Sequence, residues 1–201
     1  MAAASPTVPR RRRSRRGQGE RLREEIVDAA TALLAETGEI GALTLRAAAR
    51  RVGIAATSIY LHFPDLDSLT EAAIERAFDE FDAARDAAAL GLTDPRSVLF
   101  ARARAYCRFA LDNPGLYRVM FDVERPASER GQASFQTLVH TIQRCQSAGL
   151  TQEADTTGVA ALLWAGLHGL ASLRINRPQF PWPAPLDEDV ERLVTAILGS
   201  T

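Results

Sequence analysis

A stretch of twenty residues that begins at Thr44 constrains the fold of this chain more than any other segment. The small residue Ala49 is followed four positions later by Gly53, and six positions after that by the branched Ile59. Two helices that cross steeply at close range need a small residue at the crossing, a glycine in the turn and an apolar residue that packs the second helix. The hydroxyl of Thr44 is placed to cap the first helix. The spacing therefore predicts a helix-turn-helix whose second helical segment spans residues 55–62.

The residues after this turn carry a more specific pattern. The sequence GIAATSIYLHFP, residues 53–64, closely resembles the recognition helix of the TetR family of bacterial regulators, and its YLHF end followed by proline is the most specific part. The Thr44-Leu45-Arg46 opening and the amphipathic helix expected at Glu20–Gly38 fit the same family. This resemblance covers about the first 80 residues. It implies double-stranded DNA as a partner, read by a helix in the major groove.

The resemblance also implies which side chains contact DNA. Thr44 and Arg46 would face the phosphate backbone, to which a hydroxyl and a cation are suited. Short side chains would let the recognition helix lie deep in the groove, where Thr57 and Ser58 can bond base edges and an alanine can touch a thymine methyl. Phe63 is expected to be buried. The full expected set is Thr44, Arg46, Ala55, Ala56, Thr57, Ser58, Tyr60 and His62.

The chain departs from the family pattern in ways that reduce its positive charge. Ala55 stands where a hydroxyl residue often caps the recognition helix, and Leu66 stands where a basic residue is usual. The recognition helix holds no Arg or Lys, so we expect no bidentate contact from it to guanine. Our hypothesis is that arginines at positions 10–16 supply the missing cations.

The N-terminal segment is the most basic part of the chain. Residues 1–53 hold eleven arginines against six acidic residues, whereas the whole chain has a net charge of -1. Six arginines between Arg10 and Arg16 repel one another, so we expect residues 1–19 to form a disordered arm. Beside a helix-turn-helix, such an arm can follow phosphates or enter a minor groove. The alternative is a solubilising tail.

Apolar residues recur at helical spacing through the rest of the chain, which predicts an all-α protein. We expect a helix-turn-helix domain at residues 20–66, followed by an effector-binding and dimerisation domain at residues 67–201. A long helix should begin near Leu66, with an apolar stripe opposite an acidic one. Further helices are expected at residues 96–113, 116–122, 131–148, 156–176 and around 190–197.

The helix expected at Thr156–Asn176 has two apolar faces. One stripe includes Leu162 and Leu173, and a second includes Trp164 and Ala171. A helix of this kind must bury both faces, and a second copy of the chain is the simplest partner for the outer one. Together with the last helix, this predicts a homodimer interface at Trp164, His168, Ala171, Ile175, Val190, Val194 and Ile197.

Trp164 with His168-Gly169 resembles the signature of one group of C-terminal domains in TetR-like regulators. In that family the last two helices form the dimer as a four-helix bundle, and the body of the domain holds a small-molecule pocket. Aromatic side chains in this body are candidates to line such a pocket, and the alternative is that they are plain core. The candidates are Tyr106, Tyr117, Met120, Phe121, Phe135, Trp164 and His168.

These features favour a homodimeric repressor that an unknown small-molecule effector releases from a palindromic operator. An activator of the same fold and a sequence-independent architectural protein stay open. An enzyme would have to use His168 with Cys107 or Cys145, but both cysteines fit buried positions of helices. The sequence contains no nucleophile elbow, phosphate loop or metal-ligand spacing, so we expect no catalytic residue, metal or cofactor. The sequence contains no run of eighteen apolar residues, so we expect no membrane span. The cytoplasm is the expected location.

Overall fold

The computed structural model describes residues 18–121 and 128–199, and every element within these ranges is helical, which confirms the all-α fold. The elements are α1 (Gln18–Thr37), the 3-10 turn η1 (Ile40–Ala42), α2 (Leu45–Val52), α3 (Ala56–Ile59), α4 (Leu66–Ala89), α5 (Pro95–Asp112), α6 (Pro114–Met120), α7 (Glu129–Ser147), α8 (Thr156–Asn176) and α9 (Leu186–Leu198). The expected arm lies outside the described residues except for Gln18 and Gly19. Those two residues belong to α1 rather than to an arm, which corrects the predicted boundary.

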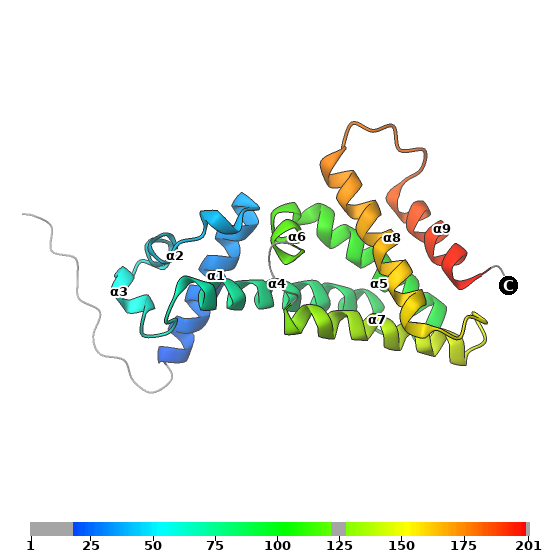
Figure 1. Ribbon diagram of the computed structural model, residues 1–201, viewed down its shortest axis with the longest axis horizontal. Helices are drawn as coiled ribbons and strands as arrows, with labels where there is room; N and C mark the ends of the chain where they lie inside the picture. Colours follow the sequence, from blue (N-terminus) through cyan, green and yellow to red (C-terminus); the bar gives the residue numbers. More distant parts are fainter. Residues whose placement is uncertain (1–17, 122–127, 200–201) are drawn as a thin grey trace, which may run out of the picture.

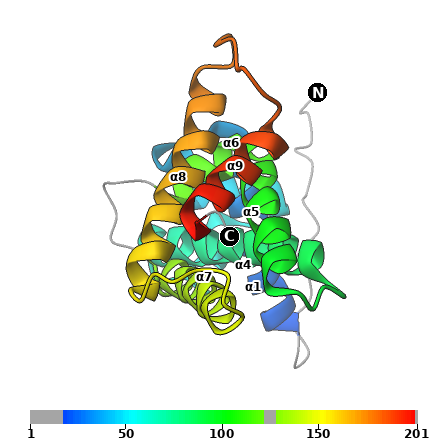
Figure 2. The same cartoon turned by 90° about the vertical axis from the view of Figure 1, so that its right-hand side faces the viewer.

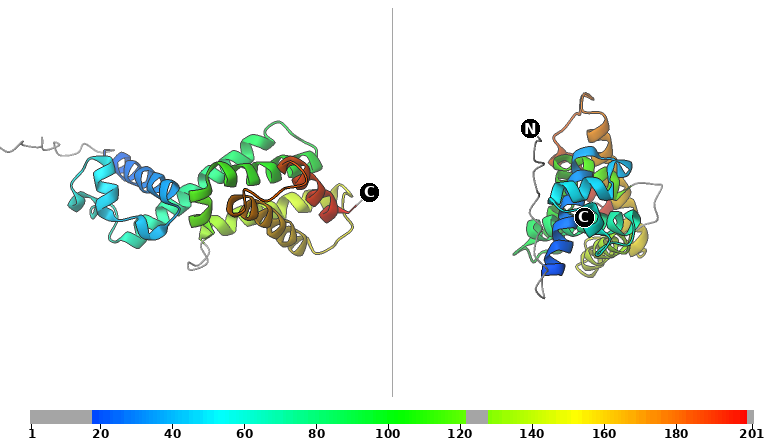
Figure 3. Two further views of the ribbon diagram at one scale, coloured as in Figure 1. Left: turned by 90° about the horizontal axis from the view of Figure 1, so that it is seen from above. Right: turned by 90° about the vertical axis from the view of Figure 1, so that its left-hand side faces the viewer.

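The molecule is elongated, and α4 connects its two ends (Figure 1). The helices α1, α2 and α3 lie together at one end, and α5 to α9 form the body at the other, a division that is also clear from above (Figure 3). Near its start α4 packs against α1, and in the body it packs against α5, α6 and α7. A single continuous helix is therefore shared by both ends of the molecule.

The helix α4 begins at a capped residue and buries one face. The Oδ1 atom of Asp65 accepts a hydrogen bond from the Ser68 amide at 2.8 Å, which satisfies one of the free donors of the first turn. Leu66 is 36% exposed and lies outside the buried stripe. The apolar residues that this helix buries are Leu69, Ala73, Ile74, Ala77, Phe78 and Phe81, which form the expected apolar stripe without Leu66.

Local capping chemistry moves two of the predicted helix starts. Pro114 occupies the first turn of α6, where its missing amide is not needed, so this helix begins before the predicted residue 116. Ser128 caps α7, because its Oγ accepts a hydrogen bond from the Gly131 amide at 3.0 Å. The helix α7 therefore starts at Glu129 rather than at residue 131.

The packing of α8 differs from the predicted pair of stripes. Its buried residues follow a single spacing of three and four positions, namely Val159, Ala160, Leu163, Leu167 and Ala171. Leu162 and Leu173, which the sequence placed on one apolar stripe, are 64% and 53% exposed. Figure 2 shows α8 and α9 side by side on one side of the body, with α5 and α7 close to them. The inner face of α8 is therefore set by these neighbours, and Leu162 and Leu173 are left on the outer face.

Three residues predicted for a subunit interface lie inside the chain's own core. Ala171, Val190 and Val194 are 0% exposed, because α5, α8 and α9 pack together at these positions. A partner chain cannot reach them, so their assignment to an interface was wrong. Of the other predicted interface residues, Trp164 is exposed, and His168, Ile175 and Ile197 are half-buried.

Among the described residues, α8 is the one helix that is long and apolar enough to cross a membrane by length and composition. Helices in the core of soluble proteins meet the same criterion. In this structure α8 packs against α5, α7 and α9, and its inner face is buried among them.

Candidate DNA interface and effector cavity

The turn between α2 and α3 has the geometry that the spacing predicted. The Oγ1 atom of Thr44 accepts a hydrogen bond from the Ala47 amide at 3.0 Å and caps α2. Gly53 ends α2 in the left-handed region, with a φ of 78°, and its amide donates to the carbonyl of Ala49 at 2.9 Å. Ala49 and Ile59 are 2% and 0% exposed. The predicted helix-turn-helix is therefore confirmed in its crossing, its turn and its packing residue.

The second helical segment is shorter than predicted. The α-helical part spans Ala56–Ile59, and a tight turn follows in which the amide of His62 donates to the carbonyl of Ile59 at 2.8 Å. Pro64 disfavours a helical conformation at the residue before it, so the helix cannot continue to the proline. Phe63 is buried at 2% exposure, and the guanidinium of Arg23 from α1 lies 5.0 Å from its ring centre. These contacts fix the end of the segment against α1.

The predicted DNA-contacting side chains lie on α3 and on the flanking ends of α2 and the turn. Thr44, Arg46, Ala55, Thr57 and Tyr60 are exposed, while Ala56, Ser58 and His62 are half-buried. Leu61 is 83% exposed beside Tyr60, and the sequence reasoning did not select it.

The cations near this surface are not equivalent. The guanidinium of Arg51 donates two hydrogen bonds to the Glu36 carboxylate, at 2.9 Å and 2.7 Å. The hydrogen bond from Arg51 holds the pKa of Glu36 below its usual value. Arg46 and Arg50 are exposed on the same helix. Arg46 and Arg50 are therefore exposed cations near this surface, whereas Glu36 offsets the charge of Arg51.

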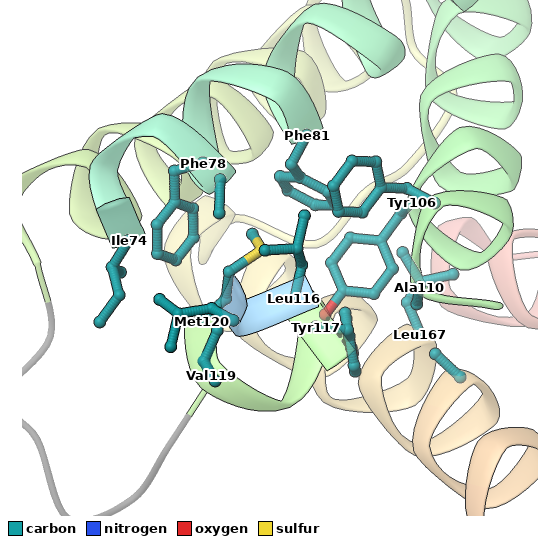
Figure 4. Close-up of a cluster of buried hydrophobic side chains, with 14 of the residues drawn as sticks. Ile74, Phe78, Phe81, Tyr106, Ala110, Leu116, Tyr117, Val119, Met120 and Leu167 are labelled. Carbon is teal, nitrogen blue, oxygen red and sulfur yellow. Dashed lines mark hydrogen bonds between the residues drawn. The ribbon is translucent and has the colours of Figure 1, made fainter. Parts of the chain in front are cut away.

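A cavity of about 510 Å³ lies in the body, between α4, α5, α6, α7 and α8. Aromatic side chains from α4, α5, α7 and α8 form part of its wall. Figure 4 shows Phe78 and Phe81 of α4 facing Tyr106 of α5 and Met120 of α6. The rings of Phe81 and Tyr106 pack edge to face with centroids 5.1 Å apart, and Phe135 and Trp164 pack in the same way at 6.0 Å. Among the residues predicted for a pocket, those that line this cavity are Tyr106, Met120, Phe121, Phe135 and Trp164.

Tyr117 and His168, which were also predicted for the pocket, are not among its lining residues. They form a polar cluster beside it, in which the Tyr117 hydroxyl lies 2.7 Å from Nδ1 of His168 and 2.9 Å from the hydroxyl of Tyr106. Burial raises the pKa of both tyrosines and lowers the pKa of His168, so all three side chains are held neutral. His168 is therefore hydrogen-bonded beside the cavity and packs against Phe121 and Trp164 of its wall, and a ligand contact at His168 or Tyr117 stays a prediction.

Two arginines line the cavity that sequence reasoning missed, Arg85 of α4 and Arg102 of α5. Arg85 is 4% exposed, and its Nη1 donates to Oδ1 of Asp82 and to Oγ of Ser134, both at 2.8 Å. The sequence did hold a signal for this residue. Arg85 follows Phe81 by four positions, so it continues the buried stripe of α4 with a charged residue.

The helix α6 joins the cavity to the helix-turn-helix end. Val119 and Met120, near its C-terminus, line the cavity. Gly115, in its first turn, lies against the end of α1, where a Cβ atom on this glycine would come within 2.1 Å of the carbonyl oxygen of Ala35. The close approach of these two backbones requires glycine at position 115. The helix α6 therefore contacts the cavity with its C-terminal end and α1 with its first turn.

The fold and these two sites define a class of protein, a helix-turn-helix DNA-binding protein with a helical body around an internal cavity. The family model described as "Bacterial regulatory proteins, tetR family" matches residues 26–73, and the one described as "Tetracyclin repressor-like, C-terminal domain" matches residues 99–197. The chain belongs to the TetR family and is a DNA-binding transcription regulator. The expectation drawn from the TetR-like segments is therefore confirmed.

Solved structures agree with this assignment. A protein of unknown function from a Rhodococcus species is 28% identical, with a TM-score of 0.75 over 88% of this chain and 93% of that chain. The fatty acid degradation regulator FadR from Bacillus halodurans is 17% identical, with a TM-score of 0.69 over 89% of this chain and 98% of that one. A TetR family transcription regulator from Marinobacter aquaeolei is 16% identical, with a TM-score of 0.68 over 91% and 97%. The last two show likeness of fold alone.

Proposed function

We propose that this protein is a homodimeric repressor that leaves a palindromic operator when a small molecule fills the cavity of its body. The observation that carries this proposal is the position of α6, which lines the cavity through Val119 and Met120 and contacts α1 through Gly115. An effector shifts the population toward the released form only if it binds that form more tightly. A cavity wall that is physically attached to the helix-turn-helix end supplies a means for such a difference.

In this proposal Thr57 and Ser58 read base edges, because they lie on the short helix that follows the turn and carry hydroxyl groups. Thr44, Arg46, Tyr60 and His62 contact the phosphate backbone. Two copies of α3 in a dimer would have to lie about 34–36 Å apart to enter successive major grooves. The operator is accordingly expected to be a palindrome with half-sites about one helical turn apart.

The dimer interface is proposed on the outer face of α8 and on α9. Leu162 and Leu173, 64% and 53% exposed, lie on one flank of α8, and Trp164, 40% exposed, lies on the other, so large apolar side chains reach solvent on both sides of its buried face. Ile175 and Ile197, both predicted for this interface, are half-buried. The proposed set keeps Trp164, His168, Ile175 and Ile197, adds Leu162 and Leu173, and loses the buried Ala171, Val190 and Val194.

The test is selection of bound fragments from random DNA by the full-length protein at stated salt, followed by footprinting. A footprint confined to a palindrome, with protein bound as a dimer, is the expected result. A footprint without sequence preference would instead favour an architectural protein. Reporter expression with and without the gene separates the repressor from the activator, since only a repressor raises expression when it is removed.

The alternative of an enzyme that uses a cysteine nucleophile has no support in the geometry. Burial raises the pKa of Cys107 to about 12 and that of Cys145 to about 11, so both stay in the thiol form at neutral pH. The thiolate is the reactive form of cysteine. Because the proposed partner is genomic DNA of a bacterial regulator, the proposed location is the cytoplasm.

A further inference from the structure

The two arginines in the cavity wall have hydrogen-bonding capacity that the described residues leave unused. The Nε atoms of Arg85 and Arg102 are both buried and have no hydrogen-bond partner within residues 18–121 and 128–199. Both residues line the same cavity, whose other walls are mainly aromatic and aliphatic. A buried N–H group without a partner costs free energy, so two of them beside one cavity point to a partner that the described residues do not provide.

Arg85 is held in place by several contacts and cannot turn away from the cavity easily. Its Nη1 is bound to Asp82 and Ser134, and its Cζ atom lies 4.9 Å from the centre of the Phe81 ring. Burial lowers the pKa of Arg85, yet arginine stays protonated in proteins. The carboxylate of Asp82 is shared with the Ser134 hydroxyl, which donates to it at 2.8 Å. The guanidinium is therefore fixed in place and paired with Asp82, and its Nε keeps an unused donor.

The acidic residues of the cavity wall lie away from this cation or at the surface. Glu71 precedes Arg85 by fourteen positions on α4, which corresponds to about 21 Å along the helix axis. Glu129 is exposed in the first turn of α7. Arg102 lies on α5 beside Arg85, and its Nη2 is bound to the exposed Asp86 at 2.5 Å. The cavity thus has two arginines between α4 and α5, each paired with an aspartate outside the lining, and a remaining wall of aromatic, aliphatic and polar side chains.

We propose that the cavity binds a small amphipathic carboxylate, whose anionic group is bound by Arg85 and Arg102 and whose apolar body lies among the aromatic side chains. This rests on the proposed function only in that the cavity is the effector site. A carboxylate accepts from an arginine Nε and a neighbouring Nη in a planar, two-point arrangement, which is the contact that the unpartnered Nε atoms lack. Alcohols and amines of the same shape cannot make this contact, and an amine adds a like charge beside the arginines.

The test compares matched ligands on the full-length protein by calorimetry. The probes are octanoate, octanol and octylamine, and 4-phenylbutyrate with its alcohol and amine counterparts. We expect at least one acid to bind roughly ten- to hundredfold more tightly than its alcohol, and the amines to bind most weakly. An alcohol or amine that binds as tightly as its acid would overturn the proposal, as would the absence of binding by both acids.

Substitutions of the two arginines test whether they cause the preference for acids. Arg85→Met and Arg102→Met are each expected to remove most of the preference for acid over alcohol, whereas Arg104→Met, an exposed arginine of α5 outside the cavity wall, leaves it unchanged. Because Arg85→Met leaves Asp82 without its cation, the double variant Asp82→Asn/Arg85→Met is measured beside it. A preference that survives in every folded variant of Arg85 and Arg102 overturns the assignment.

The outcome for DNA is read separately, by footprinting with and without each ligand. Neutral ligands that release the operator while acids do not bind would overturn the carboxylate site and leave the repressor proposal standing. If the cavity prefers acids but the protein binds no specific operator, the carboxylate site would stand and the repressor proposal would be overturned.

Discussion

Gly115 of α6 lies so close to Ala35 of α1 that a methyl group on the glycine would come within 2.1 Å of the Ala35 carbonyl oxygen and 2.9 Å of its carbonyl carbon. Both obstructing atoms belong to the backbone, so they cannot move aside as a flexible side chain would. This contact joins the first turn of the helix that ends at the cavity to the last turn of the helix that supports the helix-turn-helix.

Replacing this glycine tests whether the contact couples the two ends. We expect Gly115→Ala to lower the free energy of unfolding by about 1–3 kcal/mol, because α6 and α1 must separate. It should also weaken the response of operator binding to ligand. Thermal unfolding and DNA titrations with ligand measure the two effects. Gly19→Ala is the control, since a Cβ atom at this helical position of α1 meets nothing within 4 Å.

Replacing the hydroxyl residues of α3 tests base reading. Thr57→Ala and Ser58→Ala are each expected to reduce affinity for the selected operator roughly fivefold, while binding to unrelated DNA stays constant, since a hydrogen bond to a base edge contributes about 1 kcal/mol. Electrophoretic titrations of both DNAs at one salt concentration give the ratio. Ser147→Ala, exposed on α7, serves as the control. An equal loss on both DNAs would place these hydroxyls on phosphate instead.

Replacing the cation at the start of α2 tests phosphate binding. Arg46→Met is expected to weaken binding to all sequences alike and to reduce the slope of log affinity against log salt by about 0.9, the value for one phosphate contact. Removal of residues 1–17 should lower the slope further if the arginines at positions 10–16 act on DNA. Equal affinities and equal slopes with and without the arm would show that it is a solubilising tail.

The dependence of stability on pH tests the contribution of Asp65, which caps α4. Hydrogen bonds from Ser68 hold the pKa of Asp65 below its usual value. A carboxyl whose pKa is lowered by folding stabilises the protein above its unfolded pKa, near 3.9, and this stabilisation is lost as the pH falls through the lower folded value. The melting temperature of Asp65→Ala should therefore fall below wild type at pH 7, and the difference should shrink below about pH 4. Asp65→Ser keeps a cap that does not titrate in this range. The difference in melting temperature between this variant and wild type should therefore narrow in acid, because only the wild type loses stabilisation.

The parts of this fold that were predicted correctly depend on neighbours in the sequence. Thr44, Ala49, Gly53 and Ile59 define a turn within sixteen residues, and the structure has that turn. The end of α3 was misplaced because a run of helix-compatible residues does not reveal the tight turn before Pro64. The end of the helix is shown by the hydrogen bonds that the amides of residues 61–63 donate to the carbonyls of Ser58 and Ile59.

The burial of residues in the body depends on contacts that are distant in sequence. Two apolar stripes on α8 were equally consistent with its periodicity, and α5, α7 and α9 decide that Leu162 stays outside while Ala171 is buried. Arg85 is buried because Ser134, forty-nine residues away, meets it from α7. Aromatic composition could suggest a pocket, but it could not separate Tyr106, which lines the cavity, from Tyr117, which lies behind it.

The continuity of α4 has a mechanical consequence. The helix runs for 24 residues, which is about 36 Å, without a proline or glycine that would let it bend locally. A rotation of about 3° at its body end would therefore displace the far end, where the reading helix is attached, by about 2 Å. Hydrogen bonds to base edges operate over a range of only about half an ångström. An angular change too small to disturb the aromatic packing of the body would thus be amplified into a displacement larger than hydrogen bonds to base edges tolerate.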